Sequence, residues 1–129
     1  MSKKRILIVD DDADARLALN VRLRANGYEI FNAIDGVSAM SEARKCTPDL
    51  VILDLGLPAG DGYAVMDRFQ NHPQLAGTPV VVSGRDFRVH RNRAIRSGAK
   101  TFLQKPVDSD LLMRVVHRIF GDQADVYAQ

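Results

Sequence analysis

Apolar residues fall into five short clusters along the chain, and between them apolar residues recur every three or four positions. The short clusters predict β-strands, because strands covered on both faces of a parallel sheet read as continuous apolar runs. The three clearest strands are expected over residues 6–9, 50–53 and 80–82, and two weaker ones over residues 29–33 and 101–104.

The stretches between these clusters predict amphipathic helices. In the first stretch Leu19 and Leu23 are four residues apart, and Leu17 and Val21 are expected to widen the apolar stripe before Gly27 ends the helix. Four further helices are expected over about 37–46, from 61–62, over about 87–96 and from about 108. Strands and helices therefore alternate five times, which predicts an α/β fold with a doubly wound, five-stranded parallel sheet.

The 129 residues suit a single domain with its own core, expected over about residues 5–120, followed by a short tail over residues 121–129. No apolar run is long enough for a membrane span or a signal peptide, so we expect no membrane partner. Cys46 is the only cysteine, which excludes an intramolecular disulfide and suits a reducing, cytoplasmic setting.

The net charge of +2 is unevenly distributed. Residues 1–64 carry 8 Lys and Arg against 10 Asp and Glu, a net charge of −2, whereas residues 65–129 carry 10 against 6, a net charge of +4. Much of this excess lies in the sequence GRDFRVHRNRAIRSGAK at residues 84–100, which contains one aromatic residue and no recognised nucleic-acid motif. The simplest interpretation of this stretch is a solvated helix face, and we expect no direct binding to nucleic acid. We also hypothesise that these arginines favour an acidic partner surface.

Three consecutive carboxylates, Asp10, Asp11 and Asp12, follow the first predicted strand, and Asp54 follows the third. In an open parallel sheet these strand ends meet at one edge, where ligands bind. Neighbouring carboxylates repel one another, and hard divalent cations such as Mg²⁺ prefer oxygen ligands. The sequence therefore predicts a Mg²⁺ (or Mn²⁺) site, with Asp12 better explained as the N-cap of the following helix.

Ser83 follows the fourth predicted strand and Lys105 follows the fifth, so a hydroxyl and an ammonium are expected at the same edge. Asp54 stands alone at the end of an apolar strand and is the best-placed nucleophile, because carboxylates can form acyl phosphates. Phosphoryl transfer depends mainly on charge neutralisation, which a divalent cation and Lys105 could supply.

Four segments in order, ILIVDDD, DLVILDLGLPAGDG, VVVSG and FLQKP, carry a resemblance to a known family. The chain resembles the receiver domain of two-component response regulators, similar in architecture to the single-domain chemotaxis regulator, over about residues 5–120. The resemblance implies the flavodoxin-like (βα)5 receiver fold.

Carried over residue by residue, the resemblance implies that Asp54 is the phosphoacceptor. It implies that Asp10 and Asp11 form the acidic pair that holds the metal, with Asp11 as the more direct ligand. The backbone carbonyl of Gly56 would be a further metal ligand.

The resemblance also implies that Lys105 pairs with a phosphoryl oxygen and that Ser83 bonds the phosphoryl group. Phe102 occupies the position of the family's switch aromatic, and a core residue would read the same way. Pro106 would follow a cis peptide bond. The chain has one residue fewer between Pro79 and Ser83 than we expect of the family, so either a residue is missing upstream or Ser83 is displaced.

The function implied is phosphorelay signalling: a histidine kinase or histidine phosphotransfer protein donates a phosphoryl group to Asp54. The surface formed by the fourth helix, fifth strand and fifth helix would then change for a downstream protein partner. Such a domain is a phosphoacceptor switch rather than an enzyme, because it catalyses only its own phosphoryl transfer and dephosphorylation. The alternative is a phosphorylation-independent adaptor with the same fold. A phosphatase of the haloacid dehalogenase type is a further alternative, but it needs a second Asp two residues after the nucleophile. This chain has Gly56 at that position, which argues against such a phosphatase.

Overall fold

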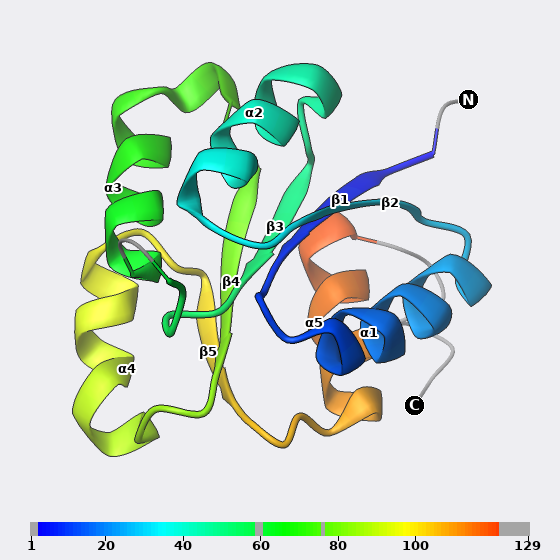
Figure 1. Cartoon of the computed structure of the whole chain (residues 1–129). Helices are drawn as coiled ribbons and strands as arrows, with labels where there is room; N and C mark the ends of the chain where they lie inside the picture. The colour runs from blue at the N-terminus through cyan, green and yellow to red at the C-terminus, as the bar shows by residue number, and fades with distance from the viewer. Residues whose placement is uncertain (1–2, 59–60, 76, 122–129) are drawn as a thin grey trace.

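The computed structural model describes residues 3–58, 61–75 and 77–121, and it contains one five-stranded parallel sheet (Figure 1). The strands are β1 (Arg5–Val9), β2 (Glu29–Ala33), β3 (Leu50–Leu53), β4 (Thr78–Ser83) and β5 (Thr101–Gln104). Their order in the sheet is β2-β1-β3-β4-β5. This is the predicted doubly wound fold. The predicted tail lies outside the described residues apart from Gly121.

Helices cover both faces of the sheet (Figure 1). They are α1 (Ala13–Ala25), α2 (Gly36–Cys46), α3 (Gly62–Asn71), α4 (Phe87–Arg96) and α5 (Ser109–Phe120), with a short 3-10 helix at Pro73–Leu75. α2, α3 and α4 pack on one face, and α1 and α5 pack on the other. Within the described ranges every helix is too short or too polar to cross a membrane.

Two apolar cores lie on opposite faces of the sheet, and every strand contributes to both. In β1, for example, Leu7 and Val9 face α2 and α3, whereas Ile6 and Ile8 face α1 and α5. Successive side chains of a strand point to opposite faces. Both faces are buried, which explains why β1, β3 and the middle of β4 read as continuous apolar runs, whereas the outer strands β2 and β5 carry polar residues.

An aspartate begins each of the five α-helices as its N-cap. The N-caps are Asp12, Asp35, Asp61, Asp86 and Asp108, and each side chain accepts a hydrogen bond from a backbone N–H of the first turn. These bonds satisfy donors that the helix itself leaves unpaired. The predicted N-cap role of Asp12 is confirmed, so this carboxylate has a structural task of its own.

The apolar stripe of α1 is narrower than predicted. Leu19 and Leu23 are buried, but Leu17 and Val21 are 63% and 62% exposed. The two exposed residues lie near Asn20 and Arg24 in a shallow groove of α1, outside the core. The expectation that they widen the buried stripe is therefore wrong: Leu19 and Leu23 face the core around the sheet, whereas residues 17 and 21 lie on the solvent side of the helix.

Candidate functional site

The carboxyl ends of β1 and β3 lie side by side at the point where the chain changes faces of the sheet. The chain leaves β1 through α1 on one face and leaves β3 through α3 on the other. Asp10 directly follows β1 and donates its N–H to the carbonyl of Ala33 (3.1 Å), and Asp54 directly follows β3 and donates its N–H to Val9 (2.9 Å). These backbone bonds hold both carboxylates in the crevice where such sheets bind ligands.

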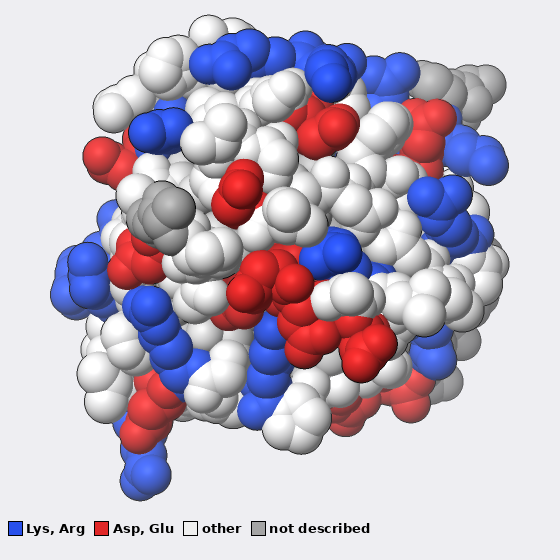
Figure 2. Space-filling view, in the orientation of Figure 1, with Lys and Arg blue, Asp and Glu red and all other residues white. Residues whose placement is uncertain are grey.

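Three carboxylates meet in this crevice. One oxygen from each of Asp10, Asp11 and Asp54 lies within 4.8 Å of the other two. Asp10 is buried, Asp54 is half-buried and Asp11 is exposed, so the group opens to solvent on one side. Figure 2 shows acidic side chains gathered near the end of β1. Oxygen donors partly open to water suit a hard divalent cation such as Mg²⁺.

Gly56 lies beside this group, because its N–H donates to Oδ1 of Asp54 (3.1 Å). A side chain at residue 56 would start 3.9 Å from that oxygen, so the glycine leaves the approach to Asp54 open. The role of its carbonyl as a metal ligand stays a prediction.

Lys105 connects the two buried strand ends. Its Nζ lies 2.7 Å from Oδ2 of Asp10 and 3.3 Å from Oδ2 of Asp54. Burial on its own lowers the pKa of Lys105, but hydrogen bonds and charges from Asp10 and Asp54 outweigh it and hold the pKa above its usual value. The ammonium is therefore permanently charged at neutral pH. The Lys105–Pro106 peptide bond is cis, as the resemblance implies.

Ser83 is the last residue of β4 and is fully buried. It pairs in register with Gln104, and its carbonyl accepts a hydrogen bond from the N–H of Lys105 (2.8 Å). Ser83 thus lies at the strand end next to Lys105 despite the shortened segment before it. Its hydroxyl oxygen accepts a hydrogen bond from the N–H of Arg85 (3.1 Å).

Phe102 lies in the middle of β5 and is only 4% exposed. Its ring packs against Phe87 at the start of α4 with 5.8 Å between centroids, in an edge-on arrangement. The ring therefore already occupies the core between the sheet and α4.

Two positioning residues at this edge were not found from the sequence. Arg16 donates from Nη1 to the carbonyl of Asp10 (2.7 Å). Gln104 donates to the carbonyl of Ser83 (3.2 Å) and accepts from the N–H of Phe87 (2.8 Å), so it ties the start of α4 to the end of β4. An arginine in a first helical turn and a glutamine at a strand end carry no sequence signal for these contacts.

The starts of α3 and α4 are joined next to the site. Arg85 Nη1 lies 3.6 Å from Oδ2 of Asp61, and the Tyr63 hydroxyl lies 2.9 Å from Nδ1 of His90. Burial is the main cause of the raised pKa of Tyr63, and the charge of Arg93 opposes it. His90 is half-buried in this contact and forms no part of the carboxylate group.

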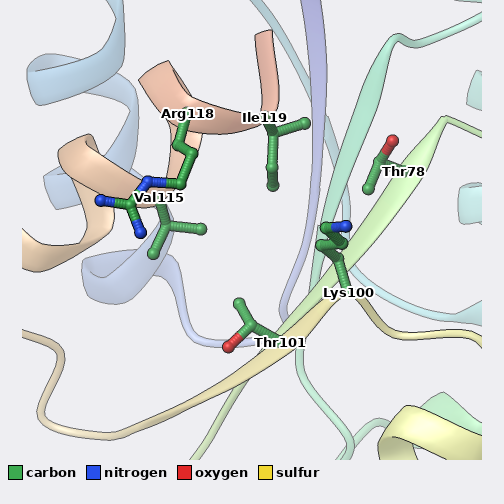
Figure 3. Close-up of a pocket in the computed structure, with 6 residues that line it drawn as sticks. All are labelled: Thr78, Lys100, Thr101, Val115, Arg118 and Ile119. Atoms are coloured by element: carbon green, nitrogen blue, oxygen red, sulfur yellow. The ribbon is translucent and has the colours of Figure 1, made fainter. Parts of the chain in front are cut away.

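A pocket of about 460 Å³ lies at the amino-terminal ends of the strands, opposite the carboxylates (Figure 3). Thr78 and Thr101 begin β4 and β5 there, and α5 closes the other side with Val115 and Ile119. Because the carboxylates lie at the other ends of the strands, this pocket is not part of the candidate site.

Comparison with known proteins gives a consistent result. The family model described as the response regulator receiver domain matches residues 6–117. The response regulator PleD of Caulobacter vibrioides is 38% identical over 117 residues, which cover 89% of this chain and 26% of PleD. Protein PilH of Pseudomonas aeruginosa is 28% identical over 118 residues, which cover 91% of this chain and 98% of PilH.

Among solved structures, a putative response regulator from Chloroflexus aurantiacus superimposes with a TM-score of 0.86 at 30% identity. The match covers 93% of this chain and 99% of that one. The chain spans only 26% of PleD and 49% of the transcriptional regulatory protein PrrA of Mycobacterium leprae, curated relatives that are both longer.

Proposed function

This chain belongs to the family of response regulator receiver domains, whose work is phosphorelay signalling, and from that premise we propose that Asp54 is its phosphoacceptor. The observation that carries the proposal is the position of Asp54. Its carboxylate lies at the end of β3, within 4.8 Å of two further carboxylates and 3.3 Å from the ammonium of Lys105. A nucleophilic carboxylate that lies between carboxylates able to hold a metal ion and the fixed ammonium of Lys105 suits phosphoryl transfer.

Asp10, Asp11 and Asp54 would hold Mg²⁺ (or Mn²⁺), with the Gly56 carbonyl as a further ligand. Three carboxylates beside one ammonium leave two negative charges uncompensated, which supports a divalent cation at this place. A bound cation would supply the positive charge that lets anionic phosphoryl oxygens approach these carboxylates.

In the proposed transfer an oxygen of Asp54 attacks the phosphorus of a phosphohistidine on a histidine kinase or phosphotransfer protein. The phosphorus–nitrogen bond breaks, its electron pair stays on the imidazole, and a mixed anhydride forms on Asp54. Lys105 lies close enough to Oδ2 of Asp54 to pair with the new phosphoryl oxygens. Its contact with Asp10 holds the ammonium there beforehand, so little reorganisation is needed.

The switch proposed here begins at Ser83, whose hydroxyl would leave the N–H of Arg85 and bond the phosphoryl group. One charge-assisted hydrogen bond is worth about 1.5–3 kcal/mol. Moving a state from 1% to 99% populated takes roughly 5.5 kcal/mol. Because Phe102 is already buried, its inward rotation cannot supply the difference, and we infer a partial switch in which the Arg85–Asp61 contact also changes.

A histidine kinase or phosphotransfer protein is the proposed upstream partner, and a protein that contacts α4, β5 and α5 is the proposed downstream partner. We place the chain in the cytoplasm, where a buried, unpaired Cys46 stays reduced.

The experiment is intact mass spectrometry after incubation with acetyl phosphate and Mg²⁺. We expect the wild type to gain one phosphoryl group, and we expect Asp54→Asn and wild type in EDTA to gain none. Asp61→Asn is the matched control, since Asp61 is the N-cap of α3 at the end of the same loop and should still permit labelling. Labelling of Asp54→Asn would refute the assignment.

The second candidate is a phosphorylation-independent adaptor, and one observation favours it. Phe102 is already turned into the core, as a permanently fixed surface would require. A wild type that gains no phosphoryl group from acetyl phosphate or from a phosphorylated phosphotransfer domain would support the adaptor.

A further inference from the structure

Five exposed residues form one face of α4, which we call the α4 outer face: Arg88, Val89, Asn92, Arg93 and Arg96. Their spacing of three and four residues places them on the same side of the helix. The opposite side of α4 faces the sheet through buried Ala94 and half-buried Ile95. The face therefore carries three arginines, one asparagine and one valine, and no acidic residue.

The arginines of this face are poorly compensated. Among the described residues Arg93 and Arg96 form no ion pair, and Arg88 has only a 3.8 Å contact with Asp86 at the helix start. Like charges three or four residues apart on a helix repel one another. Basic side chains lie on the side of the molecule that carries α4, as they also do along other parts of its outline (Figure 2). The helix would gain stability from an external anion.

Two features restrict the kind of anion. Val89 is 69% exposed at the centre of the arginines, so the bound partner can cover an apolar side chain. Arg93 and Arg96 also line a groove of about 520 Å³ between α3 and α4, whose α3 wall carries Asp61 and Asp67. A continuous polyanion that filled this groove would be repelled by the carboxylates of Asp61 and Asp67. A protein segment can instead place its acidic groups on the arginines alone.

One arginine is already held in position. The guanidinium of Arg93 lies 3.7 Å from the ring centroid of Tyr63, in a cation–π contact. Tyr63 in turn bonds His90 (2.9 Å). The planar guanidinium is thereby fixed at the rim of the groove, and fixed guanidiniums pair well with carboxylates.

We propose that the α4 outer face binds an acidic protein segment that buries an apolar side chain against Val89. The proposal rests on the proposed function only in treating α4 as part of the partner-binding face. Binding itself does not require phosphorylation of Asp54. A failure of Asp54 to accept phosphoryl would therefore leave this inference unaffected.

The test uses the full chain and a fluorescently labelled synthetic helical peptide, rich in glutamate with one leucine, measured by anisotropy at low salt. We expect saturable binding that weakens about tenfold in the Arg88→Gln, Arg93→Gln, Arg96→Gln triple variant. The matched control removes three exposed charges elsewhere, Arg44→Gln, Lys45→Gln and Arg68→Gln, and should change affinity less than twofold.

Two further arms give the apolar contribution and the class of partner. Val89→Ser, or serine in place of the peptide's leucine, should weaken binding about threefold. A 20-base-pair DNA duplex and vesicles of anionic phospholipid are measured in parallel. Tighter binding of either, lost in the α4 triple variant, would overturn the proposal in favour of that partner. Equal weakening in the two triple variants, or no saturation by the acidic peptide below about 1 mM, would also overturn it.

Discussion

Asp10 and Lys105 at the carboxyl edge of the sheet touch at 2.7 Å with side chains 5% and 26% exposed, whereas Arg88 on the α4 outer face is 90% exposed and 3.8 Å from Asp86. Both regions concentrate charge of one sign. At the carboxyl edge Asp10, Asp54 and Lys105 are largely sheltered from water, and Lys105 is bonded to both carboxylates, so each has a defined position. On α4 the charges are screened by solvent. Single substitutions should therefore be costly at the edge and nearly silent on α4.

The largest effect is expected at Gly62, where the start of α3 packs closely against the chain that follows β3. A Cβ added to Gly62 would lie 2.5 Å from the carbonyl oxygen of Asp54 and 2.7 Å from Cα of Leu55. Gly62→Ala must therefore push α3 away from the end of β3, and we expect it to lower the free energy of unfolding by about 3 kcal/mol. Urea denaturation measures this.

Gly84→Ala is the control for this variant, because an added Cβ there meets no atom within 4 Å. Its free energy of unfolding should stay within about 1 kcal/mol of the wild type. Equal losses in the two variants would mean that the close approach of Gly62 to Asp54 does not constrain the site.

The next effect concerns Lys105, the positively charged residue at the carboxyl edge. Lys105→Met leaves the buried carboxylate of Asp10 without its ion-pair partner. Removing one member of a fully buried pair costs about 3–5 kcal/mol, and the partial exposure of Lys105 reduces this to about 2 kcal/mol. Lys100→Met, which removes an exposed lysine just before β5, should change stability by less than about 0.5 kcal/mol.

The same pair predicts a pH dependence. The pKa of Lys105 is raised in the folded protein, so folding favours its charged form. The stabilisation is therefore complete below the ordinary lysine pKa of about 10.4 and is lost as pH rises through the raised value. The stability difference between wild type and Lys105→Met should stay constant from pH 7 to about 10 and shrink above it. Burial raises the pKa of Cys46 to about 11, but this thiol is present in both proteins and cancels.

The carboxyl edge could be located from the sequence because two features indicate each strand end. An apolar run stops there, and a polar residue follows. Asp10, Asp54 and Lys105 each occupy such a position, and parallel pairing brings these positions together. β4 was predicted two residues short at its start and one at its end, because Thr78 and Ser83 do not look apolar although the strand continues through them.

Side-chain contacts away from the strand ends were not predictable. The hydroxyl of Tyr63 meets His90, 27 residues along the chain, and periodicity says only that both lie on helices. His90 and His117 are half-buried and His72 is exposed, and no periodicity in the sequence distinguishes the three. The exposure of Leu17 likewise depends on which side of α1 packs against the sheet, and the apolar residues on both sides of this helix leave that open.

A smaller effect is expected at Tyr63, which lies between the carboxyl edge and the α4 outer face. Tyr63→Phe removes the hydroxyl bonded to His90 and leaves the ring beneath Arg93. We expect a loss of about 1 kcal/mol in the free energy of unfolding, the usual value of one hydrogen bond. Tyr63→Leu also removes the ring and should cost about 1 kcal/mol more. Equal losses in the two variants would mean that the cation–π contact with Arg93 contributes nothing.

The smallest effect should come from α4 itself. Asp86 accepts a hydrogen bond from the N–H of Arg88 (2.9 Å) as the N-cap of the helix, and the same carboxylate oxygen lies 3.8 Å from the Arg88 guanidinium. The N-cap bond is worth about 1 kcal/mol. The exposed ion pair is worth less than about 0.5 kcal/mol. Asp86→Ala should therefore destabilise the protein, whereas Arg88→Gln should leave urea denaturation almost unchanged at any salt concentration. A salt-dependent loss in Arg88→Gln similar to that of Asp86→Ala would show that α4 uses its charges for folding, as the carboxyl edge does, and that fewer of them are available to a partner.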